Sequence, residues 1–277
     1  MASLWIFCVS LHAITRICQI EIKKYLFTPV FIIKWISDFG RYVLLMKRIF
    51  TKPDRWNMFG RQYVAECNSL VIDSIGIIGI ISLFIGAVCC IQMQMNLFSP
   101  LLPRYTIGFT TREILMLEFS SAMMCLILAG KIGSNIASEI GTMRVTEQID
   151  AMEIMGINSA NYLILPKVCA VVTLMPILVI LSIALGLTGG GLLSWMTGAP
   201  TIDDYLYGIQ QDVKMDHIIY AIKKSMVFGF IITTVSGFFG YTVKGGALQV
   251  GRNSTQAVVI SSIMILMADV ICTKLML

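Results

Sequence analysis

The chain has 277 residues, of which 57% are hydrophobic and 13% are charged, and its mean hydropathy is +0.81. A soluble globular domain carries roughly 25% charged residues, so the composition excludes such a domain and indicates an integral membrane protein. The formal net charge of +5 comes mostly from lysine and arginine ahead of the first long apolar segment. We interpret it as a topology signal rather than as a sign of nucleic-acid binding.

Residues 1–33 hold two short apolar runs, 4–14 and 25–33. Each run is too short to cross a hydrocarbon core of about 30 Å as a helix. A signal peptide is only weakly indicated, because the basic residues follow the first run instead of preceding it. We treat 1–33 as an N-terminal extension without an assigned role.

The stretch 34–70 predicts a basic amphipathic helix that Pro53 divides. Such a helix beside a membrane span is typical of an interfacial helix, with its apolar face in the headgroup region and its cations toward anionic lipid. An ordinary cytoplasmic helix packed on the protein is an equally good interpretation, and both place this stretch on the cytoplasmic side. The apolar positions are Ile36, Phe39, Val43, Met46 and Phe50, against Arg41, Lys47, Arg48, Lys52, Arg55 and Arg61.

Five apolar segments follow, and we predict that each forms one transmembrane helix. They cover 71–95, 114–134, 163–195, 218–243 and 253–276. The third exceeds the roughly 20 residues that one span requires, so we expect a long, tilted helix with Pro176 as the site of any kink. Glycines recur in the segments and let helices approach closely in lipid, either within a packed bundle or at an oligomer seam.

The interval between the second and third segments predicts a short amphipathic helix over 139–155. Its apolar positions are Ile140, Met143, Ile149, Met152 and Met155, and its charged positions are Glu139, Arg144, Glu147, Asp150 and Glu153. Gly156, followed by Asn158 and Ser159, predicts a C-terminal cap, and we expect Pro166 in the first turn of the next helix. The pattern alone favours a solvated loop helix.

Basic residues favour the cytoplasmic side of a membrane. They are concentrated in the N-terminal stretch, in the interval 131–167 and just before the last segment, whereas the loop 196–217 holds four aspartates and one lysine. We therefore predict that the N-terminus and the 139–155 helix face the cytoplasm and that the C-terminus faces outward.

Three ionisable residues from three apolar segments fall in one layer of the membrane. Counted along the helices, Glu118 and Lys224 lie roughly 6 and 9 Å below the outer end, and Asp269 lies about 24 Å above the cytoplasmic end, so all three share the outer third of the membrane. Unpaired charges at such depth are costly, so they should face one another or a wet cavity. We hypothesise a polar lining of a substrate pathway. A structural pair between lysine and a carboxylate, or side chains that reach to the interface, is equally compatible.

The sequence shows no recognisable motif for catalysis or metal binding. Residues 129–134 read AGKIGS, which lacks the upstream glycine of a P-loop and has Ile132 at the hydroxyl position. There is no nucleophile elbow, no CxxC pair among the eight cysteines, and His12 and His217 are the only imidazoles. We predict no catalytic residue, no metal site, no disulfide and no cofactor in this chain.

The run from Glu139 to Met152, EIGTMRVTEQIDAM, resembles the signature of the MlaE (YrbE) family of ABC-transporter permeases. AGKIG precedes the run, and a Met-Gly pair ending at Gly156 and a Leu-Pro pair ending at Pro166 follow it. The similarity extends from about residue 39 to the C-terminus, through the Lys-Ser pair at 224 and 225 and the run GRNSTQAVV at 251–259. We therefore take 34–277 as an MlaE-like permease domain.

The resemblance implies an all-α integral membrane fold of five transmembrane helices, preceded by an interfacial amphipathic helix and forming a homodimer. It implies movement of phospholipids or related lipids between the inner and outer membranes, which maintains outer-membrane lipid asymmetry. An MlaF-like ATPase that binds ATP and Mg²⁺ would drive transport from the cytoplasm, and an MlaD-like MCE-domain protein would act on the outer side. We see no convincing transit peptide, so we expect a multi-pass protein of the bacterial inner membrane.

By the same resemblance, the 139–155 helix is a cytoplasmic coupling helix that docks on the ATPase. Its expected polar contacts are Glu139, Arg144, Glu147, Gln148 and Asp150. Glu118 matches the family's glutamate near the outer end of the second span, and the expected substrate-pathway residues are Glu118, Lys224 and Asp269. The arginine that commonly precedes that glutamate is Leu117 here, which leaves Arg112 as a possible replacement.

Two other function classes are compatible with the residues. A proton-coupled secondary transporter would use Glu118 and Asp269 as proton carriers and would depend on a proton gradient. A structural membrane scaffold would tolerate substitution of the polar layer. Within the resembled family, permeases also serve sterol or fatty-acid import and plastid lipid import, and the sequence leaves the lipid and the direction of transport open.

Overall fold

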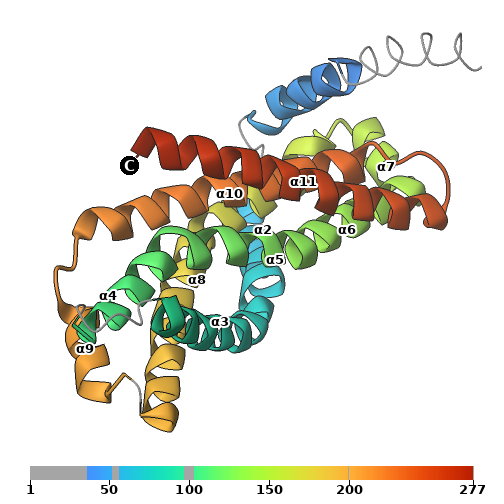
Figure 1. Cartoon of the computed structure of the whole chain (residues 1–277). Helices are drawn as coiled ribbons and strands as arrows, with labels where there is room; N and C mark the ends of the chain where they lie inside the picture. The colour runs from blue at the N-terminus through green and yellow to red at the C-terminus, as the bar shows by residue number, and fades with distance from the viewer. Residues whose placement is uncertain (1–35, 52–55, 97–102, 199, 277) are drawn as a thin grey trace, which may run out of the picture. The chain divides into compact units, whose positions relative to one another are not determined.

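The computed structural model describes residues 36–51, 56–96, 103–198 and 200–276, and all regular structure in them is helical (Figure 1). The chain divides into two compact units, Met1–Arg48 and Ile49–Leu277. In the first unit, residues 36–48 are helical, and Arg41 pairs with Asp38 at 2.6 Å. The N-terminal extension 1–33 and the predicted break at Pro53 lie outside the described residues.

Five helices of the second unit are long and apolar enough to cross a membrane, as the sequence predicted. The first joins α2 (Trp56–Glu66), η1 (Cys67–Val71), η2 (Ile72–Ser74) and α3 (Ile75–Asn96), and the second joins α4 (Tyr105–Ile114), η3 (Leu115–Met123), α5 (Met124–Leu128), η4 (Ala129–Gly133) and α6 (Ser134–Val145). The other three are α8 (Ser159–Thr197), α10 (Met215–Tyr241) and α11 (Ala247–Met276). Helices satisfy their own backbone hydrogen bonds, which a span in lipid requires.

The helices extend beyond the apolar segments from which they were predicted. The first candidate span already includes Met58, whereas the apolar segment was placed from residue 71, and the second runs to Val145 instead of residue 134. Hydropathy marks only the part of a helix that suits the hydrocarbon, whereas the hydrogen-bonded backbone continues into polar sequence. Pro166 lies inside α8 rather than in its first turn, because the helix already begins at Ser159.

The predicted single helix over 139–155 is wrong in its bounds. Its first half is the end of α6, and a separate short helix, α7 (Gln148–Ile154), follows. Between them Glu147 adopts a left-handed backbone conformation with φ 61°, which interrupts the helical path. The C-terminal cap at Gly156 is confirmed, since its φ is 78° and the Ile157 N–H donates to the Met152 carbonyl at 3.0 Å. Asn158 instead caps the start of α8.

Small residues let α3 and α8 approach within the bundle. A Cβ added to Gly86 would overlap the backbone carbonyl of Gly186, and one added to Gly189 would overlap the carbonyl of Leu83. These glycines therefore form a seam inside one chain, where backbone lies against backbone.

A short helix, α9 (Ile202–Gln210), lies between the third and fourth spans and packs on α4. Tyr205 is buried there, and its hydroxyl donates to the Leu187 carbonyl of α8 at 3.0 Å. Burial raises the pKa of the Tyr205 phenol, so it remains a neutral donor. The acidic loop 196–217 thus contains a helix that the charge pattern did not predict.

Candidate functional site

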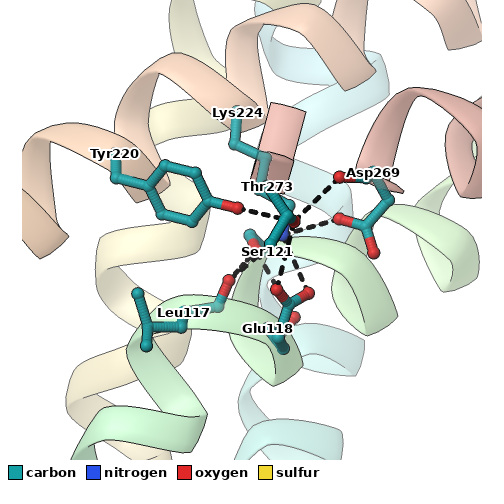
Figure 2. A network of polar contacts seen from close by, with 7 residues as sticks. All are labelled: Leu117, Glu118, Ser121, Tyr220, Lys224, Asp269 and Thr273. Carbon is teal, nitrogen blue, oxygen red and sulfur yellow. Dashed lines mark hydrogen bonds and ion pairs between the residues drawn. The ribbon is translucent and has the colours of Figure 1, made fainter. Parts of the chain in front are cut away.

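Lys224 is completely buried in α10 and lies between carboxylates from two other spans (Figure 2). Its Nζ is 2.8 Å from Oε2 of Glu118 in η3 and 2.6 Å from Oδ1 of Asp269 in α11. The same Nζ donates to the Leu117 carbonyl at 3.1 Å. We name Glu118, Lys224 and Asp269 the Lys224 cluster. It joins the second, fourth and fifth spans.

The pairing explains how a lysine is accommodated in an apolar bundle. A buried charge is costly unless opposite charges and hydrogen bonds replace its water. The Lys224 ammonium donates hydrogen bonds to Glu118 and to the Leu117 carbonyl, and the Asp269 carboxylate adds a second opposite charge within 2.6 Å. The charge of Lys224 is therefore compensated within the protein.

The members of the Lys224 cluster differ in accessibility. The side chain of Lys224 is 0% exposed and that of Asp269 is 18% exposed, whereas that of Glu118 is 41% exposed. The Thr273 hydroxyl lies 3.3 Å from Oε1 of Glu118 and 2.9 Å from the Tyr220 hydroxyl. Glu118 is therefore the group that an approaching molecule would meet first.

The helix that carries Glu118 is locally irregular. Residues Leu115–Met123 form a π-helical segment, which widens the helix by comparison with an α-helix. Such segments occur frequently at functional sites. This π-helical segment holds the Glu118 side chain toward Lys224 and Thr273 (Figure 2).

The structure thus brings together the three residues assigned to the substrate pathway, while their role in transport stays a prediction.

Arg112 does not take the place of the arginine that Leu117 replaces. Its guanidinium donates to the carbonyls of Ile209 and Gln211, each at 2.7 Å, and pairs with Glu113 at 2.6 Å. Arg112 therefore closes the C-terminal end of α9.

A second lysine between two carboxylates was not anticipated from the sequence. Lys167 of α8 has a side chain that is 2% exposed, and its Nζ lies 2.6 Å from Glu66 and 2.8 Å from Glu139. We name these residues the Lys167 cluster. It joins the first, second and third spans, so Glu139, an expected ATPase contact, is already engaged within the chain.

The other expected coupling residues divide into paired and exposed groups. Arg144 pairs with Asp150 at 2.5 Å, which fastens α7 to the end of α6. Glu147 and Gln148 are exposed and begin the short helix. The apolar side chains of Ile154 and Met155 are also highly exposed at its other end.

Tyr241, which the sequence analysis did not select, joins Glu153 and Ser159 in holding α7 against α8 and α10. The Tyr241 hydroxyl donates to Oε1 of Glu153 at 2.8 Å, and it lies 2.9 Å from the Ser159 hydroxyl. The Ser159 hydroxyl lies 3.1 Å from the same carboxylate oxygen, and the Arg144 guanidinium lies 5.9 Å from the Tyr241 ring centroid. Tyr241 therefore links α6, α7, α8 and α10 at one junction.

Metal binding finds no support in the part of the chain that the structure describes. No group of three or more histidine, cysteine, aspartate or glutamate side chains is placed there to hold a metal ion. The chemistry of both clusters is that of ion pairing between helices.

This architecture, five potential spans with ion clusters between them, defines a multi-pass α-helical membrane protein. Residues 63–275 match the family model described as Permease MlaE, so the chain belongs to the MlaE family of ABC transporter permeases.

Relatives in several lineages cover most of the chain. A probable ABC transporter permease protein of Rickettsia bellii is 37% identical over 88% of this chain and 93% of its own length. One of the cyanobacterium Synechocystis is 34% identical over 87% of this chain and 92% of its own length. The Arabidopsis thaliana chloroplastic protein trigalactosyldiacylglycerol 1 is 34% identical over 73% of this chain and 57% of its own length.

Proposed function

We propose that this permease moves phospholipids or related lipids between the inner and outer membranes of a bacterial envelope and so maintains outer-membrane lipid asymmetry. The observation that carries the proposal is the Lys224 cluster, because it places a partly exposed carboxylate among spans that are mostly apolar. A lipid likewise combines a polar headgroup with apolar acyl chains, so the cluster suits the headgroup and the apolar spans suit the chains. The name of the Arabidopsis relative, which refers to a galactolipid, also supports a lipid substrate.

The energy comes from a separate subunit. An ABC transporter permease implies an ATPase partner, and we propose an MlaF-like ATPase that binds ATP and Mg²⁺ on the cytoplasmic side. Its docking surface on this chain is α7, with exposed Glu147 and Gln148 at one end and exposed Ile154 and Met155 at the other. Glu139, Arg144 and Asp150 support that surface through their internal ion pairs.

The complete transporter contains further copies and partners in this proposal. The chain forms a homodimer in the inner membrane, and an MlaD-like MCE-domain protein binds on the outer side. Closure of the ATPase dimer displaces each α7, and α10 transmits the movement because Tyr241 at its end is bonded to Glu153. The lipid lies between the two permease halves, with its headgroup near Glu118.

Affinity purification from the native membrane in mild detergent tests this assembly. The proposal predicts that an ATPase, an MCE-domain protein and phospholipid copurify with the chain. Their reproducible absence would contradict it. Dependence of transport on a proton gradient alone would favour a secondary transporter, and silent substitution of the Lys224 cluster would favour a scaffold.

A further inference from the structure

The Lys224 cluster also indicates which headgroup chemistry it accepts, an inference that rests on the proposed function. Lysine in a lipid site commonly suggests a partner for the phosphate. Here the Lys224 side chain is completely buried, its Nζ donates to Glu118 and to the Leu117 carbonyl, and it forms an ion pair with Asp269. Because this ammonium is completely buried and already paired with two carboxylates, it does not reach the phosphate of an incoming lipid.

The net charge of the Lys224 cluster also disfavours binding of a phosphate. One ammonium and two carboxylates give the Lys224 cluster a net charge of +1 − 2 = −1. The other side chains drawn around it, among them Leu117, Tyr220 and Thr273, are uncharged (Figure 2). In a medium of low dielectric constant, this net charge repels a phosphate placed alone at the cluster and attracts a cation.

Glu118 supplies the remaining acceptor capacity. Its Oε2 accepts from Lys224, and its Oε1 has only a long contact of 3.3 Å with the Thr273 hydroxyl. A carboxylate has about four lone-pair sites, and bonds to a charged donor are stronger than neutral ones. Since the Glu118 side chain is 41% exposed, an incoming N–H donor can reach it.

We infer that Glu118 binds the primary ammonium of a zwitterionic lipid headgroup of the ethanolamine type. A primary ammonium carries N–H donors for the carboxylate, whereas a quaternary ammonium carries none and is recognised by aromatic faces. The rings of Tyr220 and Phe228 already face the Lys224 ammonium, at 5.0 and 6.0 Å from their centroids. A headgroup that has a phosphate and hydroxyls but no amine does not balance the net negative charge of the Lys224 cluster.

The test compares three lipids with identical acyl chains in binding to the purified native complex. Phosphatidylethanolamine, phosphatidylglycerol and phosphatidylcholine are each presented as the labelled minor component of the same vesicles, and the lipid retained by the complex is counted. We expect at least a fivefold preference for phosphatidylethanolamine over each of the other two. In E118Q the preference falls below twofold, and in the control D216N, an exposed acid at the start of α10, it is unchanged.

The outcomes separate this inference from the proposed function. Equal retention of the three lipids, or a preference for phosphatidylglycerol or phosphatidylcholine, overturns the ammonium site and leaves lipid transport standing. Retention of none of them overturns both. If E118Q folds poorly, the comparison of the three lipids on the unsubstituted protein still tests the preference for a primary ammonium.

Discussion

The Lys224 ammonium lies 2.6 Å from the Asp269 carboxylate, and this pair ties the fourth span to the fifth. The same ammonium holds Glu118 of the second span at 2.8 Å. A movement of any one of these helices therefore changes the environment of a buried charge. This coupling of helix position to electrostatics gives the cluster a structural role, and its part in transport is the proposal that the first experiment below tests.

Replacing Lys224 by methionine should both destabilise the chain and abolish lipid transport. The change keeps the volume but leaves two carboxylates facing each other, and breaking a buried pair costs about 3–5 kcal/mol. Thermal unfolding in detergent, followed by a lipid-transfer assay, measures both effects. Lys223→Met is the matched control, because Lys223 is exposed on the same helix. Equal melting temperatures for the two variants would contradict the role of the ion pairs.

Glu139 should stabilise the chain through Lys167 rather than only contact a partner. We expect Glu139→Gln and Lys167→Met each to lower the melting temperature of the isolated chain. The double variant should be less destabilised than the sum, with a coupling energy of about 0.5–3 kcal/mol. Strict additivity in this double-mutant cycle would show that the 2.8 Å contact contributes nothing.

Charge reversal at Glu147 should weaken coupling without unfolding the chain. Glu147 is exposed and makes no ion pair that the structure shows, so Glu147→Lys changes only the proposed docking surface. We expect several-fold less lipid moved per ATP hydrolysed. Asp150→Lys serves as a comparison, because it also breaks the pair with Arg144 and should lower stability. Normal transport by Glu147→Lys in an intact complex would argue against docking at α7.

Tyr241→Phe should loosen the junction between α7, α8 and α10. The variant keeps the ring near Arg144 but loses the hydroxyl bonded to Glu153, a charge-assisted bond of the kind that contributes about 1.5–3 kcal/mol. Hydrogen exchange of backbone amides in 148–162 should accelerate, with no change in α3. Unchanged exchange in 148–162 would mean that packing alone holds the junction.

Gly86→Ala should destabilise the bundle far more than Gly76→Ala. A Cβ at Gly86 overlaps the Gly186 carbonyl, whereas nothing lies within 4 Å of one at Gly76. Overpacking of this kind costs about 1–3 kcal/mol. Thermal unfolding of the two variants in the same detergent provides the comparison, and similar midpoints would show that α3 and α8 can separate without penalty.

The spans and the common layer of Glu118, Lys224 and Asp269 were predictable because hydropathy and helical rise depend only on local sequence. The direct pairing of these residues depends on how each helix is rotated in the bundle, which a single sequence does not specify. Glu66 was missed for a related reason. It lies in a stretch interpreted as interfacial, whereas α2 continues into the first span and carries Glu66 to Lys167.

The break at Glu147 illustrates a second limit. The apolar spacing from Ile140 to Met155 fits one helix, and no glycine or proline marks an interruption from Met143 to Met155. A glutamate with a left-handed backbone conformation is unusual, so the sequence predicts a continuous helix. In the structure, the contacts of Arg144 with Asp150 and Tyr241 favour a turn instead. Gly156 was predictable because glycine is the usual residue at such a cap.

The most direct test of the central claim is transfer of a labelled phospholipid by the purified complex reconstituted between two vesicle populations. The account predicts transfer that requires ATP and Mg²⁺, is insensitive to collapse of a proton gradient, and disappears in Lys224→Met while Lys223→Met transfers normally. Transfer that proceeds without ATP, or that persists undiminished in a folded Lys224→Met complex, would contradict it.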